Sequence, residues 1–227
     1  MKKMQIDIIA VVPELLDSPF GHSIVKRAKE KGKVDINIVS LREYGIGAYK
    51  KIDDESYGGG AGMVLMCEPL AKCIEDLKSK TCYDEIIYLS PDGNKYEQKE
   101  ANRLSMASAL LLICGHYKGI DERIREKYIS CEISIGDYVL TGGELASIVM
   151  VDSIVRLLPG VLNDETSALT DTFQDGLVAP PVYTRPASFE GMEVPEVLRS
   201  GNVKKINEWQ EEMSLKRTKE KRPDLLK

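Results

Sequence analysis

The apolar run Ala109–Cys114 constrains the fold of this chain more than any other segment. Every residue in it is apolar and the run stops at Gly115, a pattern typical of a strand that is buried on both faces. Such a strand lies inside a sheet that helices cover on both sides. The run therefore predicts an α/β fold with a mostly parallel sheet.

The segments around this run alternate between strand and helix patterns, as an α/β domain requires. Apolar or alternating runs predict further strands at 6–12, 34–40 and 85–90. Helical patterns are predicted at 20–31, 69–80, 97–108 and 145–158, with a short helical turn at 121–127. Cys114 and Cys131 fall within apolar strand patterns and are predicted to be core residues. The stretch 41–57 is long and irregular, and a glycine-rich segment, 57–63, follows it.

The C-terminal part of the chain has a different character. Residues 162–176 are polar and read as a flexible interdomain linker, while 177–227 predict a small domain of short helices anchored by Trp209. We therefore predict an α/β domain over 1–161, a linker over 162–176 and a helical domain over 177–227. Lysines and arginines are concentrated from Lys204 onward.

Composition limits the classes of protein to which the chain can belong. The formal net charge of −5 argues against an unselective polyanion binder, although the basic C-terminal surface remains compatible with RNA. The five cysteines form no CxxC pair, and no apolar stretch is long enough to span a bilayer. The N-terminal apolar run is interrupted by Asp7 and is predicted to be a core strand. We expect a cytoplasmic protein with reduced thiols and no membrane partner.

Three loops follow predicted strands, at 88–91, 114–117 and 135–143, and the last two contain glycines. In parallel sheets, ligands bind beyond the carboxyl ends of neighbouring strands, where glycine lets the backbone approach the ligand closely. Any one of these loops alone could be a plain turn. Because three of them qualify together, the sequence favours one shared small-molecule pocket.

Few side chains point to a particular chemistry by themselves. The chain has no zinc-ligand spacing and no nucleophile elbow, and its histidines are His22 and His116. His116 lies in a candidate ligand loop, where a contact or a satisfied polar group is the simpler interpretation. Arg156 stands out on the apolar helix 145–158 because a charge there requires a specific partner. An ion pair with Asp152, one turn earlier, is the simple alternative.

Short motifs along almost the whole chain resemble one family, the bacterial tRNA (guanine-N1)-methyltransferases, or TrmD family, of the knotted SPOUT methyltransferase superfamily. The motifs occur in a single order and leave little room for chance. They lie at 57–63, 89–93, 114–117, 119–123, 134–140, 142–145, 158–162, 183–186 and 191–195.

The resemblance implies that S-adenosylmethionine is bound in a deep trefoil knot at the C-terminal end of the first domain. It also implies a homodimer with its active site at the subunit interface, and methyl transfer to N1 of guanine 37 of tRNA. The implied cofactor-binding residues come from the three loops and are Tyr88, Leu89, Ser90, Pro91, Gly115, Ile135, Gly136, Asp137, Tyr138, Val139, Leu140, Gly142 and Gly143.

The resemblance also implies two catalytic residues, with Asp171 as general base and Arg156 stabilising the guanine. The chemistry suits these residue types, because guanine N1 must lose a proton before it attacks and negative charge then gathers on O6. Asp171 lies in the predicted linker, so we expect tRNA to order it, with the base delivered across the dimer interface. Implied substrate contacts are Gly58, Gly59, Gly60 and Arg185. A requirement for Mg²⁺ is also implied, although the sequence shows no ligand set for it.

The chain departs from the family pattern at two places. His116-Tyr117-Lys118 stands where relatives often have Arg-Tyr-Glu, and Ala146 where a proline often follows Glu-Leu. Two alternative functions stay open at this point. One is a SPOUT methyltransferase that acts on a ribose 2′-hydroxyl, and the other is a non-catalytic RNA-binding protein that retains the fold.

Overall fold

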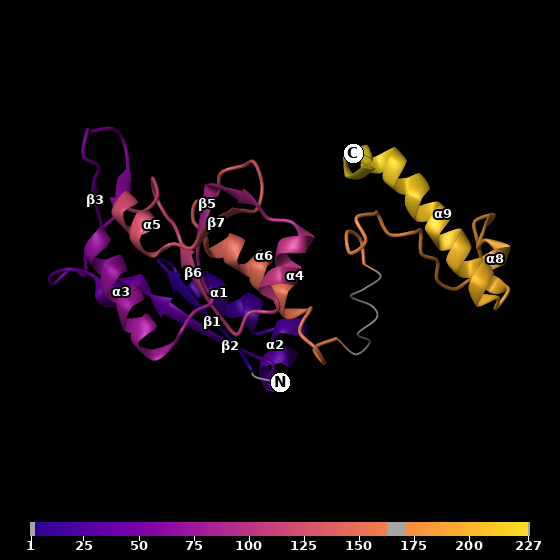
Figure 1. Cartoon of the computed structure of the whole chain (residues 1–227), viewed down its shortest axis with the longest axis horizontal. Helices are drawn as coiled ribbons and strands as arrows, with labels where there is room; N and C mark the ends of the chain where they lie inside the picture. The colour runs from indigo at the N-terminus through magenta and orange to yellow at the C-terminus, as the bar shows by residue number, and fades with distance from the viewer. Residues whose placement is uncertain (1–2, 163–170, 227) are drawn as a thin grey trace. The chain divides into compact units, whose positions relative to one another are not determined.

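The computed structural model describes residues 3–162 and 171–226 (Figure 1). The chain divides into two compact units, Met1–Glu165 and Thr166–Lys227. This division falls within the predicted linker 162–176, of which residues 163–170 lie outside the described residues. The predicted domain boundaries themselves stay predictions.

The first unit contains a five-stranded sheet in which every neighbouring pair is parallel. Its order is β2-β1-β6-β5-β7, with bounds β1 Met4–Ala10, β2 Val34–Ser40, β5 Glu85–Lys95, β6 Ala109–Cys114 and β7 Cys131–Ser134. β6 is the middle strand, and all of its residues are buried. The prediction of a mostly parallel sheet around this apolar run is confirmed.

Alternate side chains of β6 enter two separate hydrophobic cores. Leu110, Leu112 and Cys114 pack in the core beneath α1 (Glu14–Phe20), α2 (Ser23–Glu30), α4 (Gln98–Leu104) and α6 (Glu144–Val155). Leu111 and Ile113 pack in the core beneath η1 (Leu41–Tyr44), α3 (Cys67–Lys80) and α5 (Glu122–Tyr128). Helices thus cover both faces of the sheet, as Figure 1 shows. Cys114 is a core residue as predicted, and Cys131 is half-buried against the first core.

Three predicted elements differ in the structure. The helix expected over 20–31 is the shorter α2, Ser23–Glu30, and a separate helix that was not predicted, α1, precedes it and ends at Phe20, since Gly21 caps α1 and His22 is extended. The irregular stretch ends in the first strand of a hairpin, β3 (Asp53–Glu55), which pairs with β4 (Met63–Leu65) across the glycine-rich segment, and both strands are too short to show periodicity. The helix predicted over 145–158 ends at Val155, and the following residues turn toward Pro159.

The second unit is built around one long helix. It contains α8 (Glu196–Arg199), α9 (Val203–Lys221), η2 (Pro223–Leu226) and a hairpin that was not predicted, β8 (Ser188–Phe189) with β9 (Met192–Glu193). Trp209 is half-buried and lies 6.5 Å from Tyr183, ring centroid to centroid. It is therefore not the fully buried anchor that was predicted: among the described residues of this unit, only Ser214 and Thr218 are buried.

The one charged side chain within β1 is fully buried and fully partnered. The Asp7 carboxylate accepts hydrogen bonds from Gln5 Nε2 at 2.7 Å, Asn37 Nδ2 at 2.8 Å and the Tyr83 hydroxyl. Burial, together with this bond to Asp7, raises the pKa of Tyr83. Three donors from three segments thus meet one buried carboxylate, and removing it would leave Gln5, Asn37 and the half-buried Tyr83 without this acceptor.

Replacing this carboxylate should destabilise the first unit. Asp7→Ala is expected to lower its free energy of unfolding by about 2–3 kcal/mol, because the remaining donors lose their acceptor. Urea unfolding followed by far-ultraviolet circular dichroism measures the change, since the single tryptophan lies in the other unit. Asp35→Ala on the neighbouring strand is the control: Asp35 is exposed, pairs with Lys3 at 3.1 Å and should change stability by less than about 0.5 kcal/mol. Equal effects of the two substitutions would contradict this interpretation.

Candidate functional site

The carboxyl ends of β5, β6 and β7 meet at one edge of the sheet. Leu89 of β5 pairs with Cys114 of β6 on one side and with Ile133 of β7 on the other. The β5–β7 register shifts between Leu89 and Asn94, so β5 bulges outward at the residues between them. Two of the three loops that the sequence singled out therefore follow β6 and β7, whereas the third, 88–91, lies within β5 where this strand bulges, because β5 continues to Lys95.

The loops after β6 and β7 are held together by backbone contacts. The Gly143 amide donates to the Gly115 carbonyl at 2.8 Å, and His116 forms an antiparallel bridge with Gly142. A Cβ on Gly143 would lie 2.7 Å from the Cys114 Cα, a distance that real Cβ atoms essentially never show. Glycine is thus required here because two backbones touch. The trefoil knot itself stays a prediction.

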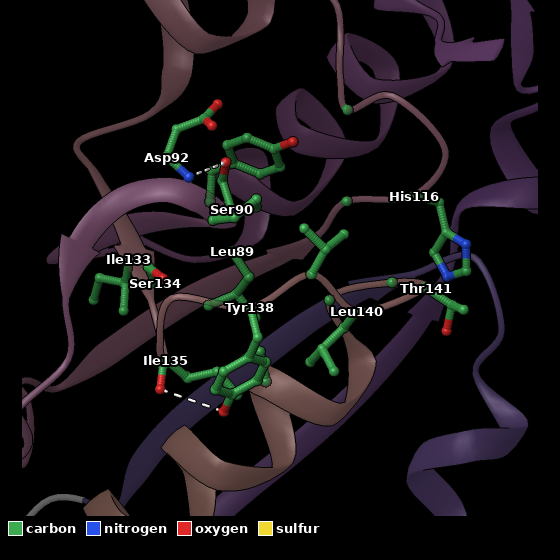
Figure 2. Close-up of a pocket in the computed structure, with 18 of the residues that line it drawn as sticks. Leu89, Ser90, Asp92, His116, Ile133, Ser134, Ile135, Tyr138, Leu140 and Thr141 are labelled. Atoms are coloured by element: carbon green, nitrogen blue, oxygen red, sulfur yellow. Dashed lines mark hydrogen bonds between the residues drawn. The ribbon is translucent and has the colours of Figure 1, made fainter. Parts of the chain in front are cut away.

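These loops enclose one pocket beside the sheet edge (Figure 2). All of the predicted cofactor-binding residues line it except Asp137, which is exposed in the same loop. Their role in binding a cofactor stays a prediction. The lining residues are Tyr88, Leu89, Ser90, Pro91, Asp92, Gly115, His116, Tyr117, Lys118, Gly119, Arg125, Ile133, Ser134, Ile135, Gly136, Tyr138, Val139, Leu140, Thr141, Gly142, Gly143 and Ala146.

The pocket wall combines apolar side chains with exposed backbone. Figure 2 shows Leu89 of β5 and two residues of the loop after β7, Ile135 and Leu140, around the same space, with Tyr138 between them. The Tyr138 hydroxyl lies 3.5 Å from the Ile135 carbonyl, so the loop is folded back on itself. Apolar walls with a few polar groups are what a nucleoside-sized ligand requires.

One ion-paired arginine supports the pocket from α5. The Arg125 guanidinium donates to both carboxylate oxygens of Glu132, at 2.8 and 2.6 Å, and lies 5.5 Å from the centre of the Tyr88 ring. The hydrogen bonds with Glu132 raise the pKa of Arg125, and burial raises that of Tyr88. Both groups keep their ordinary protonation at neutral pH. The arrangement fixes the Tyr88 ring. A Cβ added to Gly115 would lie 2.9 Å from that ring.

A buried carboxylate at the start of α6 joins two of the strand ends. Glu144 is 1% exposed, and its Oε1 accepts from the backbone amides of Val11 at 3.0 Å and Val12 at 3.1 Å. Its Oε2 lies 2.8 Å from His116 Nε2. The simple interpretation of His116 as a satisfied polar group is thus consistent with the structure. Burial and the nearby Glu144 raise the pKa of the Cys114 thiol well above its ordinary value, so this cysteine is not a thiolate nucleophile.

Several lining residues were not predicted from the sequence. Most of them, such as Asp92, Lys118 and Thr141, adjoin predicted residues within the same loops, and extending each loop by a few positions would have found them. Arg125 is different, because it belongs to a helix and its position depends on tertiary packing, as does that of Glu144, which supports the pocket without lining it. No pattern in the sequence connects Glu144 with the end of β1.

The predicted catalytic residues lie in different units. Arg156 is the half-buried C-cap residue of α6 in the first unit. Asp171 is half-buried in the second unit, where its carbonyl accepts from the Gln174 amide at 3.3 Å. The expected pairing of the two at one guanine stays a prediction.

The predicted guanine-side loop projects from the first unit as the tip of the β3–β4 hairpin. Gly58, Gly59 and Gly60 all have positive φ, and a Cβ on any of them would meet no atom within 4 Å. The loop is therefore open for a ligand to approach. Its second strand is hydrogen-bonded to the pocket loop, where the Lys118 amide donates to the Met63 carbonyl at 3.0 Å. The other predicted substrate contact, Arg185, is exposed in the second unit.

Metal sites and membrane spans were both sought in the described residues. No group of three or more histidine, cysteine, aspartate or glutamate side chains is placed there to hold a metal ion. No helix in the described parts of the chain is both long and apolar enough to cross a membrane.

Comparisons with known proteins agree with the motifs over almost the whole chain. Residues 4–227 match the family described as tRNA (Guanine-1)-methyltransferase TrmD. A protein of Christiangramia forsetii named tRNA (guanine-N(1)-)-methyltransferase is 59% identical over 223 residues, covering 98% of this chain and 99% of the relative. Relatives with the same name from Cytophaga hutchinsonii (59% identical, 98% and 94% covered) and Bacteroides fragilis (56%, 98% and 99%) are similar over nearly their full lengths.

The family match thus spans both units, including the three segments that enclose the pocket. Membership of a methyltransferase family implies S-adenosylmethionine as the methyl donor. The chain belongs to the tRNA (guanine-1)-methyltransferase family.

Proposed function

We propose that this protein transfers a methyl group from S-adenosylmethionine to N1 of guanine 37 of tRNA. The observation that carries the proposal is the pocket at the ends of β5, β6 and β7, whose walls are the loops that the family motifs mark. The relatives' names specify tRNA as the substrate and guanine N1 as the acceptor. Because tRNA is found in the cytoplasm, we propose that the protein acts in that compartment.

The pocket residues fit the methyl donor chemically. Leu89, Ile135 and Leu140 provide apolar contacts for a nucleoside, and the glycines at 115, 142 and 143 let the pocket segments pack closely against one another. The donor supplies an already activated methyl on a positively charged sulfur. The task of the chain is therefore to orient the two reactants and to exclude water.

Guanine requires two further functions from the protein. In the proposed mechanism, the Asp171 carboxylate takes the N1 proton, which makes the nitrogen nucleophilic. The Arg156 guanidinium donates hydrogen bonds to O6, where the negative charge gathers as the proton leaves. Because Asp171 and Arg156 belong to different units, the bound tRNA would bring the general base, Asp171, to the methyl-donor pocket.

The hairpin tip Gly58–Gly60 and the exposed Arg185 are proposed to contact the tRNA. Glycines with open surroundings allow a base to lie directly against the backbone. Arg185 can contact phosphate or a base edge. Mg²⁺ has no ligand set in the described residues, and a magnesium requirement stays a prediction.

We also propose a homodimer that shares its active sites between subunits. Tyr138 and Val139 of the pocket loop are 56% and 83% exposed, and Leu145 and Val149, one turn apart on α6, are 49% and 48% exposed. Apolar side chains so close to a pocket are suited to burial against a second copy of the chain.

Methyl transfer and nucleoside mapping test the proposed reaction. With labelled S-adenosylmethionine, the protein is expected to methylate a tRNA transcript that has guanine at position 37 and to leave a transcript with adenine there unlabelled. Digestion should give 1-methylguanosine. A 2′-O-methylated nucleoside would instead support the ribose alternative. Donor binding too weak to detect, together with absent transfer, would support the non-catalytic alternative.

Removal of the proposed base should slow chemistry without weakening donor binding. Asp171→Ala is expected to lower kcat by about 100-fold or more, as is typical when a general base is lost. Single-turnover transfer and calorimetry with the donor separate the two effects. Asp175→Ala is the matched control, since this exposed neighbour caps a turn by accepting from the Leu177 amide at 3.0 Å. Near wild-type transfer by folded Asp171→Ala protein would exclude Asp171 as the base.

Mixed dimers test whether one active site takes its catalytic residues from both subunits. If Arg156 and Asp171 act on one guanine from different subunits, a random mixture of Arg156→Ala and Asp171→Ala chains contains heterodimers with one intact site. Half of the dimers would be of this kind, which gives about a quarter of wild-type activity. If both residues act from one chain, mixing restores nothing.

A further inference from the structure

The segment that follows β6 connects the pocket to the glycine-rich hairpin, and it is held at both ends. Near the pocket, His116 bridges to Gly142. Farther along, the Lys118 amide donates to the Met63 carbonyl and the Leu65 amide to the Gly119 carbonyl, both at 3.0 Å. The position of His116 therefore affects the pocket wall directly, while the backbone bonds of Lys118 and Gly119 hold the hairpin in place independently of the imidazole.

His116 is held in place by a carboxylate that cannot easily move. Glu144 is almost completely buried, and its Oε1 accepts from two backbone amides at the end of β1, Val11 and Val12. The remaining oxygen, Oε2, faces His116 Nε2 at 2.8 Å. A buried carboxylate that loses such a partner keeps its desolvation cost, so the contact strongly favours one orientation of the ring.

The ring has little other space available. A Cβ on Gly142 would lie 2.1 Å from His116 Nε2, so the imidazole is packed against the backbone of the facing loop. The same side chain lines the pocket, where Figure 2 shows it beside Thr141. Displacing the ring would therefore open the junction between the loops after β6 and β7.

We propose that Glu144 and His116 are positioning residues that set the shape of the methyl-donor pocket through this hydrogen bond. The inference rests on the proposed function, because it takes the pocket to be the donor site. The carboxylate accepts, so His116 carries a proton on Nε2. Neither residue needs to touch the transferred methyl group, since both act through the pocket wall.

A pair of amide substitutions isolates the hydrogen bond from the size of the side chain. In His116→Gln the amide nitrogen takes the position of Nε2 and can still donate to Glu144, whereas in His116→Asn it takes the position of Nδ1 and falls short. Calorimetry with S-adenosylhomocysteine should give a Kd within about threefold of wild type for His116→Gln and at least about tenfold weaker for His116→Asn. His22→Asn, at the exposed second histidine, is the control.

Steady-state kinetics distinguish positioning from a general structural defect. For His116→Asn we expect the KM for the donor to rise, while kcat at saturating donor and the KM for tRNA stay within about threefold of wild type. His116→Gln should recover the donor KM. Equal donor affinities for the Gln and Asn variants would overturn the proposal, as would a fall in kcat with the donor KM unchanged.

A measurement on the wild-type protein applies even if a variant fails to fold. The chain has two histidines, so nitrogen-15 spectra of the imidazole rings are readily assigned. The proposal predicts that His116 carries its proton on Nε2, and a ring protonated on Nδ1 alone would overturn it. If the wild-type protein binds neither S-adenosylmethionine nor S-adenosylhomocysteine, the proposed function fails. If it binds them and the variants do not differ, only the positioning role fails.

Discussion

The backbone contact between Gly143 and Gly115 is the constraint on which the site depends. It joins the loops after β6 and β7 at a distance that leaves no room for a side chain on Gly143. Because β5, β6 and β7 are neighbours in a parallel sheet, their ends already lie at one edge, and this contact closes the edge into a pocket. The buried Glu144 then ties the same junction to the end of β1.

The sheet could be predicted from sequence because its signals are local. Ala109–Cys114 is uniformly apolar, and a strand of that kind occupies the interior of a helix-covered sheet. The loops after β6 and β7 were predicted for a related reason, since a turn that contains glycine and follows an apolar run can be recognised in the sequence. The family resemblance supplied residue roles that periodicity alone does not contain.

Other features depend on tertiary contacts and leave no local pattern. The hairpin of β3 and β4 has strands too short for alternation to be recognised, and α1 contains a proline that obscures its helical pattern. Glu144 looks like an ordinary first-turn acid of a helix, yet it accepts hydrogen bonds from residues more than a hundred positions away. Trp209 seemed to be a core residue because of its size, but a unit built on one long helix does not enclose it.

The central claim is that the three loop ends hold the methyl donor, and a crystal structure with S-adenosylhomocysteine tests it most directly. The account predicts density for the nucleoside between Leu89, Ile135 and Leu140, with its polar atoms bonded to the backbone of 135–143. Ordered ligand elsewhere on the protein, with this pocket filled only by solvent, would contradict the account.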